Sequence, residues 1–139
     1  MKNLSQYKEK VNAREILVQA LYEYSFGHKN AKSSEDSFRK AFRKTKIDYI
    51  LFRNIFGHIT KSTSDQKKII SEIAEVEMFG IKTIEVMEMN ILLIIQAEFE
   101  LEGTPREILI DEGVRLSKKF CSSNSYKFIN ATLEKILKS

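Results

Sequence analysis

The sequence contains few of the residues that build turns or cross-link a chain. Its 139 residues include one proline, five glycines and one cysteine, and no tryptophan. A β-sandwich or β-barrel needs a turn about every ten residues, which so little proline and glycine does not supply. The lone Cys121 excludes an internal disulfide framework, and a chain of this length can bury a core without disulfides or a metal. We therefore expect an all-α protein.

Long apolar runs are absent as well. The longest, 91–95, is far shorter than the roughly 20 residues that cross a bilayer, and the first residues contain no apolar stretch typical of a signal peptide. Hydrophobic residues nevertheless make up 42% of the chain and recur throughout, which is not typical of disorder. The sequence therefore predicts a soluble, cytoplasmic helical protein with no membrane partner.

Helical periodicity predicts about seven helices in a single domain that covers the whole chain. We expect the first helix to follow Asn12 as its N-cap, and a second to restart at Ser33. Ser62–Asp65 should end a third helix and cap a fourth, and Thr104–Glu107 should form a capping box. The segment 84–101 is apolar on nearly every side, which predicts a buried central helix.

Charge is unevenly placed along the chain. Residues 1–70 hold 15 Lys and Arg against 7 Asp and Glu, whereas residues 71–139 hold 8 against 12. A basic half joined to an acidic half favours a polyanion as partner. Random asymmetry of a solvated surface would give the same counts, so charge alone leaves both interpretations open.

Catalytic chemistry finds little support in the sequence. Neither His28 nor His58 has a carboxylate at helical spacing, and no glycine-rich phosphate loop occurs. We expect a protein that is not an enzyme and that has neither a cofactor nor a metal site.

Basic residues beside aromatic rings indicate binding of single-stranded RNA, because cations bind phosphates and a ring stacks on an unpaired base. Basic residues cluster at three places in the sequence. At the start of the first helix they are Lys8, Lys10 and Arg14, and at the end of the second they are Arg39, Lys40, Arg43, Lys44 and Lys46. Around a serine-rich break near the C-terminus they are Lys118, Lys119 and Lys127, interleaved with Tyr126 and Phe128. The residues alone leave open a second interpretation, in which Phe128 belongs to the core and the lysines only confer solubility.

Three motifs resemble those of the NusB family of bacterial transcription antitermination factors. Ala13–Tyr22 reads A-R-E-I-L-V-Q-A-L-Y, where the family has A-R-E-x-A-x-Q-A-L-Y. Pro105–Phe120 is similar to I-P-x-x-V-A-I-N-E-A-V-E-L-A-K-x-F without a gap, and Ser125–Asn130 is similar to D-S-[HY]-K-F-V-N-G. Leu51–Arg53 and Glu100–Leu101 add shorter matches. Because the motifs occur in order across nearly the whole chain, their combination is far more specific than any one of them.

The resemblance implies an all-helical fold of two packed three-helix bundles, here a basic bundle over residues 1–80 and a second bundle over 81–139. It also implies a function. Family members bind the boxA element of ribosomal RNA operon leaders together with a small-subunit ribosomal protein, NusE, and the pair joins an RNA polymerase complex that suppresses premature termination. The resemblance leaves open the preferred RNA sequence, the affinity, and whether the free protein is a monomer or a homodimer.

The matched motifs also imply site residues. The implied RNA contacts, with two lysines added on charge alone, are Lys8, Lys10, Arg14, Asn124, Ser125, Lys127 and Phe128. We expect the cations near the N-terminus to converge on the ring of Phe128. Tyr22 and Asn90 are the candidates for contact with the protein partner. Because Tyr22 falls off the apolar stripe of its helix, it is expected to be exposed or to pack into the second bundle.

The sequence also departs from the family pattern. The basic cluster that precedes A-R-E is thinner here, and Asn124 has a neutral amide where many relatives have a carboxylate, which we interpret as partial compensation. Ala131 replaces a glycine, and Ile94 and Ile95 stand where the central helix should have an arginine. Two other functions therefore stay open: a helical protein-binding adaptor without RNA recognition, and a domain that accompanies a separate RNA methyltransferase.

Overall fold

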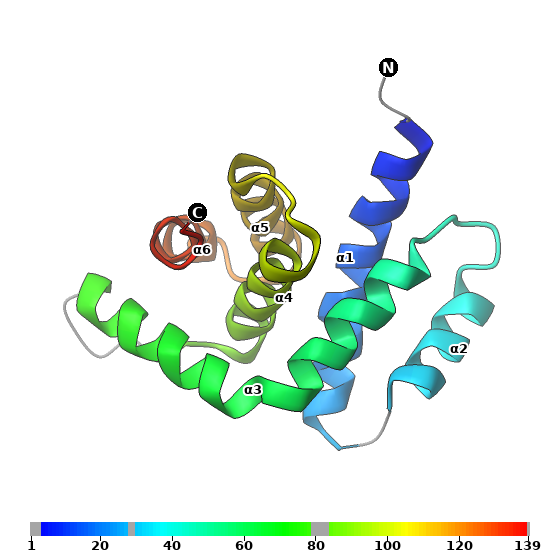
Figure 1. Cartoon of the computed structure of the whole chain (residues 1–139), viewed down its shortest axis with the longest axis horizontal. Helices are drawn as coiled ribbons and strands as arrows, with labels where there is room; N and C mark the ends of the chain where they lie inside the picture. Colours follow the sequence, from blue (N-terminus) through cyan, green and yellow to red (C-terminus); the bar gives the residue numbers. More distant parts are fainter. Residues whose placement is uncertain (1–3, 28–29, 79–83, 139) are drawn as a thin grey trace.

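The computed structural model describes residues 4–27, 30–78 and 84–138, which form helices joined by short connections (Figure 1). This part of the chain contains no strand, and its helices are α1 (Leu4–Ser25), α2 (Ala31–Ala41), α3 (Tyr49–Met78), α4 (Val86–Glu102), α5 (Arg106–Phe120) and α6 (Ser125–Ile136). The prediction of an all-α fold is confirmed.

The helices form two packed groups, as Figure 1 shows. In the first, α1 and α2 pack against the first half of α3; in the second, α5 and α6 pack against each other and against α4. Contacts of α4 with α1 and α3 join the two groups into one fold. The predicted boundary between the bundles, at residues 80 and 81, lies outside the described residues.

The central position of α4 explains its composition. It packs against α1, α3, α5 and α6, so every side of the helix faces another helix. Ile91, Leu92, Ile94 and Ile95 are accordingly inaccessible to solvent, which confirms the predicted buried central helix. Helix α4 ends before Gly103, which has a left-handed backbone conformation with φ at 65°. Residues with a side chain rarely adopt this conformation. None of the described helices is both long and apolar enough to cross a membrane.

The third and fourth predicted helices are a single helix, α3, so the predicted break at Ser62–Asp65 is wrong. Serine, threonine and aspartate cost only a few tenths of a kcal/mol each inside a helix, less than packing contributes. The apolar stripe of α3 continues across them, from Ile55 and Ile59 to Ile70 and Ala74, all of which are buried. Packing against α4 and α6 therefore outweighs the local signal for a break.

Two other predicted N-caps, Asn12 and Thr104, are also wrong, because their side chains bind elsewhere. Helix α1 begins at Leu4, and Asn12 lies inside it and donates a hydrogen bond from its amide to the carbonyl of Lys46 (3.0 Å). Helix α5 begins at Arg106, and the Thr104 hydroxyl donates to the carboxylate of Glu98 (2.8 Å). Both polar groups connect separate elements and do not cap a helix.

Helices α5 and α6 approach each other closely at Gly113. An added Cβ there would overlap the side chain of Leu133 and touch Ile129, so the absence of a side chain permits this packing. The predicted interruption at Ser122–Ser125 is confirmed except for its last residue, because α5 ends at Phe120 and α6 already begins at Ser125.

Candidate functional site

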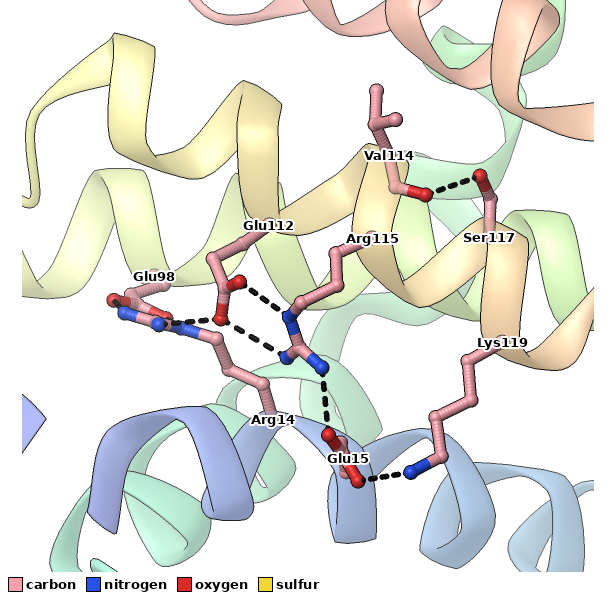
Figure 2. A network of polar contacts seen from close by, with 8 residues as sticks. All are labelled: Arg14, Glu15, Glu98, Glu112, Val114, Arg115, Ser117 and Lys119. Atoms are coloured by element: carbon pink, nitrogen blue, oxygen red, sulfur yellow. Dashed lines mark hydrogen bonds and ion pairs between the residues drawn. The ribbon is translucent and has the colours of Figure 1, made fainter. Parts of the chain in front are cut away.

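A buried network of charged side chains joins α1 to α4 and α5 (Figure 2). The side chain of Arg14 is 2% exposed, and its guanidinium donates to both carboxylate oxygens of Glu98, at 2.7 Å and 2.6 Å. The remaining terminal nitrogen donates to the carboxylate of Glu112 at 2.8 Å. Arg14 therefore binds one carboxylate from α4 and another from α5, with bidentate geometry toward Glu98.

The network continues toward the surface through α5. Arg115 donates to Glu112 through two nitrogens, at 2.6 Å and 3.1 Å, and to Glu15 of α1 at 2.6 Å. Lys119 donates to the other oxygen of Glu15 at 2.7 Å. Figure 2 shows that the side chains of Glu112, Arg115 and Lys119 extend from α5 toward α1. Arg14 and Glu15 therefore each connect α1 to α5.

The charged forms of these groups stabilise one another. Burial alone would lower the pKa of Arg14, but the hydrogen bonds and charges of Glu98 and Glu112 outweigh it and raise that pKa. Burial alone would raise the pKa of Glu112, but Arg115 and Arg14 hold the pKa of this carboxyl below its usual value. The pKa of Glu15 is also lowered, because Lys119 and Arg115 outweigh burial. Arg14, Glu15 and Glu112 are therefore ionised at neutral pH.

The prediction that Arg14 contacts RNA does not fit this position, because its guanidinium is enclosed and already bound to two carboxylates. Arg14 holds three helices together. Sequence reasoning missed this role, although two signals were available. Arg14 lies three residues before Leu17, on the apolar stripe of α1, and Glu98 lies among the buried residues of α4.

The predicted stacking of Phe128 on a base is likewise inconsistent with the structure. Phe128 is 3% exposed and Ser125 is 4% exposed, and both belong to the buried face of α6 together with Ile129 and Leu133. The alternative interpretation, in which Phe128 belongs to the core, is the one the structure supports. Phe128 and Ser125 therefore position the segment from within.

The exposed residues at this end of the fold form a cluster that we call the α5–α6 corner: Lys118, Asn124, Tyr126 and Lys127. The three polar residues are exposed, and the Tyr126 ring is half-buried. The Lys118 ammonium lies 4.8 Å from the centre of that ring, and the Lys127 ammonium lies 6.0 Å from it. At the corner, an aromatic ring thus lies close to two cations, and the ring is Tyr126 instead of Phe128.

The basic residues at the start of α1 do not converge on this corner. Helices α1 and α5 run in the same direction in both figures, so the residues before Arg14 extend toward the beginning of α5. The corner follows the opposite end of α5, whose 15 residues span about 22 Å. The predicted convergence of Lys8 and Lys10 on Phe128 is therefore wrong. Lys8 is exposed and Lys10 is half-buried.

Lys8 instead faces the connection between α2 and α3. A groove at the start of α1, which we call the α1 groove, is lined by Leu4, Ser5, Lys8, Glu9, Asn12, Lys44, Thr45 and Lys46. Two contacts attach the connection to α1: the amide of Asn12 donates to the Lys46 carbonyl, and the Asp48 N–H donates to the Glu9 carbonyl at 3.1 Å.

The two residues predicted to contact a protein partner lie in different environments. Tyr22 is 42% exposed and packs edge-on against Phe26, itself 57% exposed, so Tyr22 is accessible as expected from its place off the stripe. Asn90 is only 5% exposed, so a direct contact of its side chain with a partner does not fit the structure. Tyr24, two residues further along α1, is 40% exposed and packs edge-on against Phe56.

The fold and the site define a class: a two-bundle helical protein in which a charged network joins the bundles and basic residues remain on the surface. Comparison with known proteins gives the family. The family model described as NusB family matches residues 11–138, and the chain belongs to this family.

Several relatives are named Transcription antitermination protein NusB. The one from Aliarcobacter butzleri is 30% identical over 133 residues, which cover 94% of this chain and 98% of the relative. The one from Buchnera aphidicola is 33% identical over 124 residues, covering 88% and 85%. The one from Sodalis glossinidius is 27% identical over 127 residues, covering 89% and 88%.

Proposed function

We propose that the protein is a transcription antitermination factor that binds boxA-like single-stranded RNA of ribosomal RNA operon leaders. It does so together with the ribosomal protein NusE, within an antitermination complex of RNA polymerase. The observation that carries the proposal is the family match over residues 11–138, together with relatives that are named transcription antitermination proteins. The protein acts by binding, and it works in the cytoplasm, where transcripts are made.

The α5–α6 corner is the proposed RNA surface of the second bundle. Lys118 and Lys127 bind phosphates, and the Tyr126 ring between them stacks on an unpaired base in the role first assigned to Phe128. The neutral amide of Asn124 avoids the repulsion that a carboxylate would exert on a phosphate. The first bundle contributes two lysines of α1, the exposed Lys8 and the half-buried Lys10.

A second protein is needed for tight binding. Three phosphate contacts, from Lys8, Lys118 and Lys127, give a salt slope of about −2.1 at roughly 0.7 per contact on a single strand. A fourfold rise in salt then weakens binding about twentyfold, and non-specific affinities at physiological salt lie around 10⁻⁴ to 10⁻⁶ M. We propose that NusE supplies further RNA contacts and docks on a surface that includes Tyr22, with Asn90 supporting that surface from inside.

The test is fluorescence anisotropy with a labelled boxA-like RNA, between 50 and 200 mM salt, with and without NusE. Replacing Tyr126 by leucine should weaken binding about five- to a hundredfold, because stacking contributes about 1–3 kcal/mol per base. The matched variant Phe128→Leu should lower the melting temperature and leave the affinity of the folded protein nearly unchanged. Adding NusE should raise the affinity of the wild-type protein at least tenfold.

One structural observation favours a second candidate, a helical adaptor that binds protein and not RNA. Three of the RNA contacts implied by the resemblance, Arg14, Ser125 and Phe128, are buried, whereas the aromatic pair Tyr22–Phe26 is exposed. Wild-type protein that binds NusE, but shows no RNA binding at 50 mM salt with or without it, would establish the adaptor and contradict the proposed function.

A further inference from the structure

We propose that the α1 groove is a second RNA-binding surface, in which Lys44 and Lys46 join Lys8 to bind successive phosphates of a single strand. The inference rests on the proposed function for the identity of the ligand. It goes beyond that function because the connection between α2 and α3 carries none of the motifs that resemble the family.

The groove carries an excess of positive charge that the described part of the protein does not neutralise, which favours binding of an external anion. Lys8, Lys44 and Lys46 line it and are exposed, and none of them forms an ion pair with another described residue. The single carboxylate in the lining belongs to Glu9. Like charges gathered on one surface raise the local concentration of polyanions.

The basic surface continues from the groove along α2. Lys40 and Arg43 are exposed and line a neighbouring hollow with Arg39. Arg39 differs from them, because its guanidinium is bound to Glu35 at 2.8 Å and lies 4.1 Å from the centre of the Tyr49 ring. The remaining cations therefore form a track that extends beyond the groove.

The backbone that presents these lysines is fixed. Besides the two contacts that attach it to α1, the Thr45 N–H donates to the Phe42 carbonyl at 3.0 Å, and the Asp48 carboxylate caps α3 by accepting from the Leu51 N–H at 2.9 Å. Ile47, 8% exposed, anchors the segment in the core. Binding therefore requires ordering of lysine side chains and not of the loop, which reduces its entropic cost.

An extended RNA strand fits the groove better than a compact anion or an acidic protein. The groove is open, and its three lysines come from two segments, α1 and the connection between α2 and α3, which suits phosphates repeated along a chain. A basic groove that follows the backbone of the nucleic acid is the usual arrangement for binding single strands.

The test compares two double variants with equal loss of charge. The first, Lys44→Gln/Lys46→Gln, alters the groove; the second, Lys67→Gln/Lys68→Gln, alters exposed lysines in the second half of α3. Binding of a single-stranded boxA-like RNA is measured between 50 and 200 mM salt in the presence of NusE. The groove variant should make the salt slope less negative by about 1.4, and the α3 variant should leave it unchanged.

Every other outcome contradicts the inference, and each one indicates a different explanation. If the wild-type protein binds RNA and the groove variant keeps its salt slope, the inference fails and the proposed function stands. Equal losses in both double variants would show a general effect of net charge. A groove variant that binds RNA normally but has lost affinity for NusE would assign the groove to the protein partner. If the wild-type protein binds no RNA, the proposed function fails together with the inference.

Discussion

Two cations on the same helix have opposite surroundings. Arg14 is enclosed between carboxylates of α4 and α5, whereas Lys8, less than two turns earlier in α1, is exposed beside Lys44 and Lys46. Because they are six residues apart, the two side chains lie on different faces of α1, and each face meets different groups. A cation opposite carboxylates stabilises the fold, and a cation opposite other cations remains available to an external anion.

The balance of charge in the two regions supports this distinction. The network contains three cations and three carboxylates: Arg14, Arg115 and Lys119, with Glu15, Glu98 and Glu112. The α1 groove contains three lysines and one carboxylate. Ion pairs that are buried and matched are costly to break, whereas exposed cations can be replaced at little cost to stability.

The largest expected effect is that of Arg14→Ala on stability. It leaves Glu98 buried without its bidentate partner and Glu112 with Arg115 alone, and breaking a buried ion pair in this way typically costs about 3–5 kcal/mol of unfolding free energy. Urea unfolding at pH 7 measures the loss. Lys8→Ala, on the same helix, is the matched control and should change the free energy by no more than about 0.5 kcal/mol.

A second variant separates the buried charge from lost packing. In Arg14→Ala/Glu98→Gln, neutralising one carboxylate should recover part of the stability, so the double variant should be less destabilised than the sum of the single ones. Strict additivity, or an Arg14→Ala protein as stable as the Lys8→Ala protein, would mean that the network does not hold the helices together.

Acidification should weaken the network without any substitution. The pKa values of Glu112 and Glu15 lie below the value of 4.5 that these groups have when the chain is unfolded. Between the folded and unfolded pKa values the unfolded chain binds more protons, so this contribution to stability is present above about pH 4.5 and is lost as the pH falls below it. Unfolding free energies at pH 7, 4 and 3 should decline in that order, and the decline should be smaller in Glu112→Gln. Constant stability over this range would contradict the prediction.

The sequence predicts the helical class from the helical periodicity of its apolar residues, and the buried α4 from a segment that is apolar on nearly every side. It predicts the break in α3 wrongly, since packing against α4 and α6 decides that point and leaves no local signal. For Phe128 the signal was present: Ser125, Phe128 and Thr132 share the buried face of α6, at helical spacing. Which cation meets a carboxylate depends on residues about a hundred positions away, as for Arg14 and Glu112, and no local pattern contains that information.

The smallest expected effect belongs to Lys119, which combines features of both regions. It is an exposed lysine of α5, like Lys118, but its ammonium is bound to Glu15 at 2.7 Å. Lys119→Ala should therefore lower the unfolding free energy by at most about 1 kcal/mol, and by less at high salt, because the pair is exposed and screened. Its effect on RNA binding should be small as well, since Glu15 already neutralises this charge. Lys118→Ala, the neighbouring control, should leave stability unchanged and reduce the salt slope by about 0.7. Equal effects of the two substitutions on the salt slope would mean that pairing within the protein does not decide which surface cations bind RNA.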